Sequence, residues 1–244
     1  ESIILDFTRH MNKLIGGPLP LDNNSKKKNS QKFNNYPLVP SYITVQPGMF
    51  YRDFEKITLS KGLILPCYTA SKSLNAMGGM FGNNSAGERT LKYGKMEDYI
   101  LEAKVILADG NEYVVKPLSK SNLDNKMAQE DLEGNVYRNI YELINKNEVE
   151  IKLAKPKVSK NSAGYYIWNV LSQAKNSKNS GAFALGDIRT GDPRRLEFFN
   201  SSPAYFDLNK LLVGSQGTLG IVTEMTLKII PDNKHSKLVV IFMK

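Results

Sequence analysis

The segment that decides the fold reads TASKSLNAMGGMFGNNSAG, at residues 69–87. Its four glycines remove side chains at positions where a backbone has to approach a neighbour closely. Its serines and asparagines add hydroxyl and amide groups, and free N–H groups at a turn or at a helix start bind phosphate well. The segment therefore predicts a cradle for a diphosphate or, with equal weight, a tight small-residue turn packed against a helix.

A second glycine-rich segment, GSQGTLG at residues 214–220, precedes a run with the composition of a strand. The Rossmann fingerprint requires a helix at this place, and the chain contains no Gly-Lys-Ser or Gly-Lys-Thr sequence of a P-loop. Neither a nicotinamide-binding Rossmann domain nor a P-loop nucleotidase is therefore supported.

Composition bounds the remaining classes. The chain has 244 residues, of which 41% are hydrophobic and 23% charged, as in a soluble globular protein. Cys67 is the only cysteine, which excludes an internal disulfide framework, and no zinc-site spacing occurs. With no membrane-span run and no signal peptide, we expect a cytoplasmic protein, with peripheral membrane attachment left open. The net charge of +9 comes from dispersed lysines, and no recognition motif supports nucleic-acid binding.

The apolar pattern predicts interspersed strands and helices. Asp109-Gly110 predicts a hairpin with a type I′ turn, and Pro47-Gly48 predicts another turn. We expect loops or insertions at about 18–40 and 172–204, and a partnerless strand at 238–244 that, with Glu1 as the first residue, indicates a fragment. The order favours an α+β fold over a doubly wound sheet. Strands are expected at 2–7, 43–46, 63–65, 100–108, 113–115 and 221–230, and helices from 50 to a cap at 62 and at 127–145.

Eight short motifs also occur in an order that carries a resemblance. Each is modest alone, but together they are similar to the vanillyl-alcohol-oxidase-like flavoproteins with a PCMH-type FAD-binding domain, and above all to the D-lactate dehydrogenase and glycolate oxidase subunit branch. The motifs are VQPG at 45–48, GLILP at 62–66, GG at 78–79 with NNSAG at 83–87, KYG at 92–94, Asp98, LADG at 107–110, NSAGY at 161–165 and GSQGTLGIVTE at 214–224.

The resemblance implies a PCMH-type domain of mixed sheets with flanking helices over 1–231, incomplete at both ends. The first phosphate loop of the family would lie upstream of residue 3, and 232–244 would begin a C-terminal substrate or cap domain. Tyr93 and Gly94 would shape the wall near the isoalloxazine. The other implied contacts to FAD are Ala70, Ser71, Lys72, Ser73, Leu74, Asn75, Ala76, Gly78, Gly79, Asn83, Asn84, Ser85, Ala86, Gly87, Ser215, Gln216, Gly217, Thr218, Leu219, Gly220 and Ile221.

The implied activity is the oxidation of a 2-hydroxy acid, such as D-lactate or glycolate, by hydride transfer to flavin N5. The substrate would be a small hydroxycarboxylate, and the electron acceptor a protein or a quinone. The alternatives are an oxidase or reductase of another alcohol, sugar or cell-wall precursor, or a non-catalytic module that has lost its flavin. No catalytic base and no metal site is assigned.

Several chemically distinctive residues have plainer interpretations. Cys67 lies too early in the motif to tether a flavin, so we expect a buried structural thiol and noncovalent FAD. Asp98 is either a cap or a ligand contact. The aromatic residues Tyr165, Tyr166 and Trp168 favour core packing over stacking on a flavin.

Overall fold

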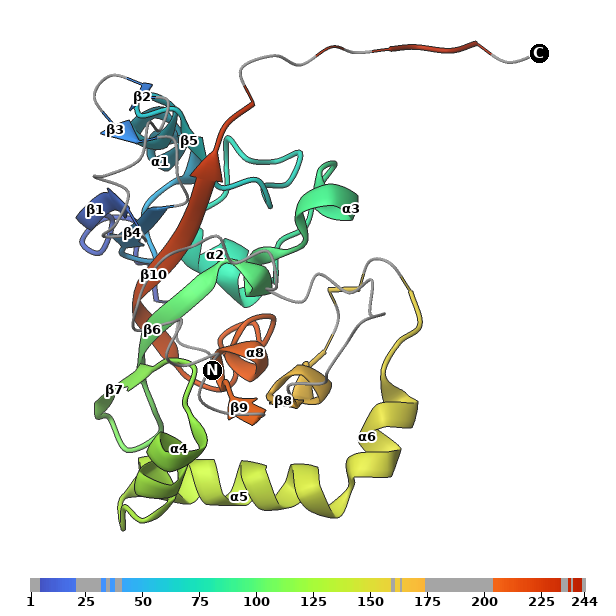
Figure 1. Cartoon of the computed structure of the whole chain (residues 1–244). Coiled ribbons are helices and arrows are strands. Elements are labelled where there is room, and N and C mark those ends of the chain that lie inside the picture. Colours follow the sequence, from blue (N-terminus) through green and yellow to red (C-terminus); the bar gives the residue numbers. More distant parts are fainter. Residues whose placement is uncertain are drawn as a thin grey trace.

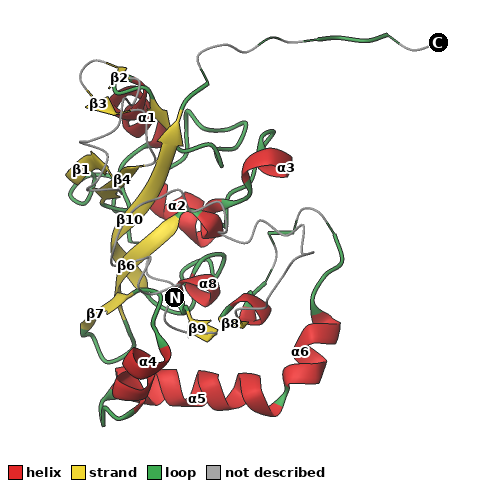
Figure 2. Cartoon of the chain, in the orientation of Figure 1, coloured by secondary structure: helices red, strands yellow, loops and turns green. Residues whose placement is uncertain are grey.

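The computed structural model describes residues 5–20, 32–33, 36–37, 41–158, 161–162, 164–173, 204–233, 237 and 239–242. Its centre is an antiparallel sheet with the strand order β1-β4-β10-β6-β7, to which β5 adds by pairing with β10. Helices lie around this sheet, which confirms the α+β fold (Figures 1 and 2). The strands are β1 Leu14–Pro20, β4 Ser41–Val45, β5 Leu63–Ile64, β6 Ile100–Ile106, β7 Glu112–Val115 and β10 Ile221–Pro231.

The long strand β10 lies at the centre of the sheet, and its side chains alternate between buried and less buried positions. Met225, Leu227 and Ile229 are fully buried on one face, whereas the intervening residues are only half-buried. Met225 pairs with Val45 on one side and with Ala103 on the other. The buried face of β10 thus continues into the neighbouring strands β4 and β6.

Helix α1 (Tyr51–Leu59) forms where the apolar spacing predicts it. Phe54 is fully buried, and the Tyr51 hydroxyl donates to the Leu65 carbonyl at 2.9 Å. Gly62 ends the helical region with φ +69°, and its N–H donates to the Leu59 carbonyl at 2.9 Å.

At the other end of the sheet, α4 (Lys120–Met127) and α5 (Leu132–Lys146) form a helical hairpin, followed by α6 (Glu148–Ala154) (Figure 1). The helix expected at 127–145 begins later, because the Asp131 carboxylate accepts from Gly134 N–H at 2.8 Å and caps α5. Tyr137 on α5 packs its ring 5.7 Å from that of Phe206.

The remaining elements are short. Strands β8 and β9 pair with each other. Between them lie residues 174–203 of the insertion expected at 172–204, which are outside the described part. The short elements are α2 Met77–Gly82, α3 Thr90–Tyr93, η2 Met96–Asp98, η3 Ile167–Asn169, α8 Asn209–Leu212, β2 Lys32–Phe33, β3 Tyr36–Pro37, β8 Leu171–Gln173 and β9 Ala204–Phe206.

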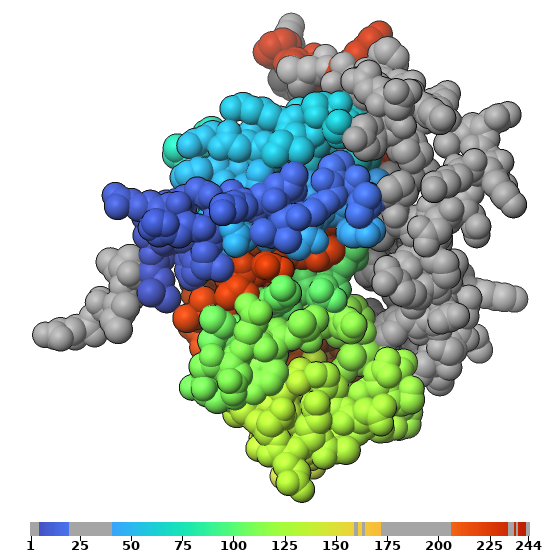
Figure 3. Space-filling view, turned by 90° about the vertical axis from the view of Figure 1, so that its left-hand side faces the viewer, coloured from blue at the N-terminus to red at the C-terminus, as the bar shows by residue number. Residues whose placement is uncertain are grey.

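Expectations for the chain ends were partly wrong. The strand expected at 2–7 does not form in the described residues 5–7, because Asp6 accepts from both the N–H and the hydroxyl of Thr8 at 2.8 and 2.7 Å. The strand β1 forms later and reaches into the region expected to be a loop at 18–40, where it lies beside the segment that carries β4 and α1 (Figure 3). Residues 239–242, expected within a strand, have no regular structure.

The hairpin of β6 and β7 is confirmed, but its turn type was wrong. Of the central pair only Gly110 has a positive φ, +81°. Gly110 N–H donates to Leu107 at 3.0 Å and Leu107 N–H to Asn111 at 3.1 Å, which makes a three-residue loop closed by a glycine bulge.

A candidate dinucleotide-binding surface

The helix α2 is held at its start by the Pro47-Gly48 turn. Gly78 N–H donates to the Pro47 carbonyl at 2.7 Å and Met77 N–H to the Met49 carbonyl at 2.8 Å. A Cβ at Gly78 would lie 2.7 Å from the Pro47 Cβ, so a side chain does not fit there. Gly78 is therefore a packing requirement of the fold.

The expected diphosphate turn at 70–76 immediately precedes α2. Its side chains close a ring, in which Thr69 Oγ1 lies 2.9 Å from Ser71 Oγ, Ser71 Oγ donates to Asn75 Oδ1 at 3.0 Å and Asn75 Nδ2 donates to Thr69 Oγ1 at 2.6 Å. Among the described residues, the backbone N–H groups of Ser71 and Ser73 meet no acceptor. The side-chain ring shapes the turn, and the exposed amides remain available to an anion.

The end of α2 meets the second glycine-rich turn. Gly214 N–H donates to the Phe81 carbonyl at 3.0 Å, and Gln216 N–H donates to the Gly82 carbonyl at 2.9 Å. Gln216 and Gly217 have φ +54° and +79°, and Thr218 N–H donates to the Ser215 carbonyl at 3.1 Å, so residues 215–218 form a type I′ turn. The structure thus joins the second glycine-rich turn to the end of α2, and the turn at 70–76 lies at the start of the same helix.

The stretch at 83–87 lies between these turns. Asn84 is fully buried with φ +47°, and its Oδ1 accepts from Glu97 N–H at 3.0 Å. Its Nδ2 has no hydrogen-bond partner. Ser85 is buried as well, and its carbonyl accepts from Met96 N–H at 3.0 Å. Gly87 is a packing position, because a Cβ there would lie 1.9 Å from the Tyr68 carbonyl oxygen.

A largely buried ionic cluster around Lys95 and Glu97 contacts this stretch. Lys95 Nζ lies 2.8 Å from Glu97 Oε1 and donates to the Asn161 carbonyl at 2.8 Å. Asn169 Nδ2 donates to Glu97 Oε2 at 3.2 Å, and Lys210 Nζ donates to the Glu97 carbonyl. Burial alone would lower the pKa of Lys95, but the Glu97 carboxylate raises it above the ordinary lysine value. The cluster therefore joins η2, the 161–169 segment and α8 around Asn84.

Tyr93 and Gly94 lie outside this junction. Tyr93 Oη accepts from Asn233 Nδ2 at 2.9 Å, and its carbonyl accepts from the Tyr99 hydroxyl at 2.5 Å. Gly94 has φ +80°, and a Cβ there would lie 2.2 Å from Asp98 Oδ2. Asp98 itself accepts from Lys95 N–H at 2.9 Å, and burial raises its pKa. Asp98 is thus a cap, one of its two expected roles.

Two glycines of the surface have no packing reason to be glycine. A Cβ at Gly79 or at Gly217 would meet nothing within 4 Å, and both residues are exposed. Gly79 is helical, where glycine costs about 1 kcal/mol relative to alanine. Gly82 is also uncrowded, with Gln216 Cα 3.5 Å from its Cβ position, whereas a Cβ at Gly220 would lie 2.6 Å from Val105 Cγ1. The open positions are compatible with close approach of a ligand to the backbone.

The other implied positions divide by exposure. Ser71, Ser73, Leu74, Asn83, Thr218, Leu219 and Ile221 are exposed, and Ser215 is buried. Lys72 Nζ pairs with Glu55 Oε1 at 2.7 Å and lies 4.6 Å from the centre of the Tyr68 ring. Ala70 is exposed, and Ala76 and Ala86 are half-buried.

The aromatic residues after Gly164 separate into two kinds. Tyr166 is buried with its ring 5.2 Å from that of Trp168, as core packing predicts. Tyr165 is 47% exposed, and its hydroxyl lies 2.8 Å from Thr218 Oγ1. Sequence reasoning missed this contact and the Lys95–Glu97 cluster, because both join segments far apart along the chain.

The thiol of Cys67 is fully buried and lies 3.7 Å from the sulfur of Met96, which confirms the structural thiol. Desolvation raises its pKa. Within the described ranges, no helix is long and apolar enough to cross a membrane. The same residues contain no group of three or more His, Cys, Asp or Glu side chains that could hold a metal ion.

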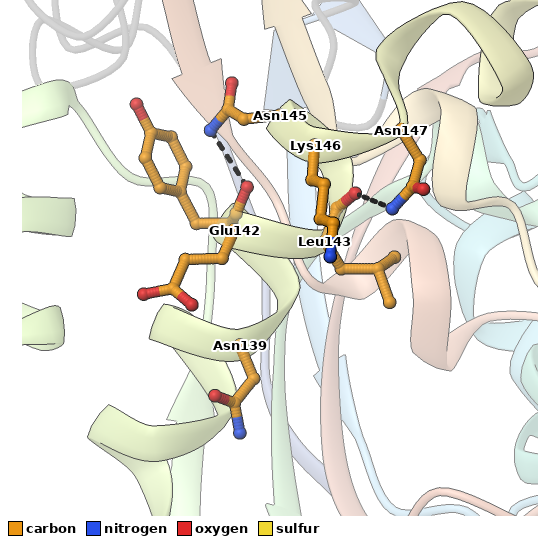
Figure 4. A pocket seen from close by; sticks show the side chains of 7 residues that line it. Asn139, Glu142, Leu143, Asn145, Lys146 and Asn147 are labelled. Atoms are coloured by element: carbon orange, nitrogen blue, oxygen red, sulfur yellow. Dashed lines mark hydrogen bonds between the residues drawn. The ribbon is translucent and has the colours of Figure 1, made fainter.

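A shallow pocket lies along α5, away from the glycine turns (Figure 4). Its Asn145 and Asn147 amides already donate to the carbonyls of Tyr141 and Leu143 at 2.9 and 2.8 Å. All its lining residues come from 139–147, so it brings no other element to a ligand. We assign it no role.

Comparison with known proteins confirms the resemblance and the cofactor. Residues 29–116 match the family model described as FAD binding domain. The chain is 23% identical over 239 residues to D-2-hydroxyglutarate dehydrogenase of Pseudomonas putida, covering 98% of this chain and 19% of that protein. It is 26% identical over 194 residues to glycolate oxidase subunit GlcD of Bacillus subtilis, covering 80% of this chain and 24% of that protein.

A D-lactate dehydrogenase of Anaerostipes hadrus is 23% identical over 192 residues, covering 79% of this chain and 23% of that protein. A solved structure of alkyldihydroxyacetonephosphate synthase covers 93% of this chain and 22% of its own, with a TM-score of 0.43 and 15% identity. The chain thus carries an FAD-binding domain and spans about a fifth of the length of these relatives.

Proposed function

Because residues 29–116 match an FAD binding domain, we propose that the chain holds FAD for a dehydrogenase of 2-hydroxy acids. One observation carries the proposal: the turn at 70–76, the stretch at 83–87 and the turn at 214–221 adjoin α2, and the exposed, uncrowded Gly79 lies among them. The six-residue helix is about 9 Å long at 1.5 Å per residue, so its two ends suit separate parts of an extended dinucleotide.

The donors of this surface fit FAD. The free amides of Ser71 and Ser73 would bind the diphosphate, since exposed N–H groups of a turn favour an anion. The N–H of Gly217, which also meets no acceptor in the described part of the chain, would donate further along the cofactor. Bound FAD would supply the hydride acceptor for the oxidation. The buried Cys67 thiol supports noncovalent attachment.

No residue of this surface is proposed as the catalytic base. The Glu97 carboxylate is occupied by Lys95 and Asn169, and Asp98 accepts from the backbone of Lys95. A base has to reach the proton that it removes, and these buried carboxylates already have donors. The lysine side chains of the cluster likewise already have acceptors within the protein.

The names of the relatives support a substrate class. Their names specify D-2-hydroxyglutarate, glycolate and D-lactate, which share a hydroxyl on the carbon beside a carboxylate. We propose a hydroxycarboxylate substrate, a protein or quinone as electron acceptor, and a cytoplasmic location. The domain division at residue 231 is also proposed, with FAD held by 1–231.

Anaerobic reduction of the bound flavin tests this proposal. The purified protein, loaded with FAD, is mixed with D-2-hydroxyglutarate, D-lactate or glycolate, and the flavin absorbance is followed. Bleaching by at least one hydroxy acid, with no bleaching by its 2-deoxy counterpart, is expected. Bleaching only by a simple alcohol or a sugar would favour the alternative activity, and a protein that takes up no FAD would contradict the proposal altogether.

A further inference from the structure

The type I′ turn at 215–218 is joined by hydroxyl groups to a segment 53 residues earlier in the chain. Thr218 Oγ1 donates to the Ser215 carbonyl at 2.7 Å and lies 2.8 Å from Tyr165 Oη. A threonine hydroxyl has one proton. Because that proton goes to Ser215, the Tyr165 hydroxyl must be the donor to Thr218. The hydrogen bonds thus run in one direction, from Tyr165 through Thr218 to the turn.

Buried hydrogen bonds of neighbouring residues fix the backbone that carries Tyr165. The neighbouring Tyr166 is 2% exposed, and its hydroxyl and Lys95 Nζ both donate to the Asn161 carbonyl. Lys95 Nζ also lies 4.3 Å from the centre of the Tyr166 ring. Tyr165 itself is 47% exposed, so its side chain does not fill the core. Its position is set by the buried cluster while its hydroxyl points at the turn.

The turn has few other restraints. It precedes β10, which begins at Ile221, and Gln216 within it has φ +54°, a conformation that costs an L-residue about 1 kcal/mol. Its backbone is held by the bonds from Ser215 N–H to Leu212, from Gln216 N–H to Gly82 and from Thr218 N–H to Ser215. A side-chain bond to Thr218 therefore bears directly on a strained turn.

We propose that Tyr165 is a positioning residue of the cofactor site. Its hydroxyl holds Thr218, which keeps the strained turn in the form that presents the Gly217 N–H to the dinucleotide. This inference rests on the proposed function, because the turn has to contact FAD for its conformation to matter to binding. Tyr165 acts through Thr218 and needs no contact of its own with the cofactor.

The test measures the FAD dissociation constant by flavin fluorescence, together with the melting temperature of the FAD-free protein. Tyr165→Phe and Thr218→Val should each weaken FAD binding roughly three- to tenfold, the scale of one hydrogen bond. The double variant should bind no worse than Thr218→Val alone, because both changes remove the same bond.

The matched control is Tyr113→Phe. Its hydroxyl donates to Asp109 Oδ2 at 2.6 Å in the β6–β7 hairpin, so the change removes a comparable exposed tyrosine bond that involves none of the implied cofactor contacts. FAD affinity should not change in this variant. If Tyr165→Phe binds FAD normally, or only lowers the melting temperature, the inference fails while the cofactor proposal stands. If the unchanged protein binds no FAD, both fail.

Discussion

Gly78 and Gly79 are neighbours in α2 but are glycine for different reasons. At Gly78 a Cβ would collide with Pro47, whereas at Gly79 it would meet nothing. The first residue is required for the helix to dock on the Pro47-Gly48 turn. The second is exposed in a helix that alanine would stabilise, and the proposed function accounts for it by a ligand that approaches the helix.

Cys67 provides a prediction at the same scale. Its thiol is fully buried and its pKa is raised by desolvation, so the reactive thiolate is suppressed. A disulfide reagent such as DTNB should leave the folded protein unlabelled even at a pH of about 9, where an exposed thiol is largely ionised. The same protein in urea should react with one equivalent. Rapid labelling of the folded protein would contradict the buried position.

At the scale of elements, a type I′ turn forms elsewhere than at the pair for which the sequence predicts it. Asp109-Gly110 forms a glycine-bulge hairpin although the pair is typical of type I′, whereas the type I′ turn forms at Gln216-Gly217. Gln216 adopts a positive φ although glutamine disfavours it, and its N–H donates to the carbonyl of Gly82 in α2, which lies far away in the sequence. Such a contact has no local sequence signal.

The sequence predicted α1, β10 and the β6–β7 hairpin because their apolar residues repeat with a clear period. It missed α4 because Leu123 is the only buried residue of that helix, and a single apolar residue defines no face. It missed β1 because this edge strand is bulged and includes Gly16, Gly17 and Pro18. The glycine turns of the site were recognised from composition, but the hydrogen bonds that join them required the fold.

The buried pair Lys95–Glu97 yields a prediction for the elements that it joins. Glu97→Gln would leave the Lys95 ammonium buried without its counter-charge, and we expect a loss of about 3 kcal/mol in the free energy of unfolding. Asp53→Asn removes the exposed partner of Lys56 and should cost less than about 1 kcal/mol. Urea unfolding measures both. Equal effects would mean that the cluster does not brace the junction around Asn84.

For the whole molecule, the sheet places the candidate surface at its middle. The central strand β10 follows directly from the turn at 214–220, and α2 and α8 lie close together beside the sheet (Figure 1). The FAD-binding match at 29–116 includes α2 and the turn before it, whereas the turn at 214–221 joins the same surface from a later part of the chain. The candidate surface therefore forms only when the chain folds and brings these two parts of the sequence together.

The core also predicts how the stability of the whole molecule depends on pH. Desolvation raises the pKa values of Cys67, Tyr51, Tyr99 and Tyr137, so all four groups stay neutral in the folded state. In the unfolded chain they ionise from a pH of about 8.5 for cysteine and about 10 for tyrosine. Their contribution is therefore complete below these values and is lost as the pH rises. The urea concentration at which half of the protein is unfolded should decrease as the pH is raised from 7 to about 10.5. A constant or higher midpoint would contradict this explanation.

FAD binding by Gly79→Ala, compared with Asn139→Ala on the exposed side of α5, shows directly whether the dinucleotide lies on α2. Both changes replace an exposed helical residue by alanine and should raise the melting temperature of the FAD-free protein. Only Gly79→Ala should weaken FAD binding, by roughly tenfold or more, because its methyl group would occupy the space against the cofactor. Unchanged FAD affinity in Gly79→Ala would contradict a dinucleotide lying on α2.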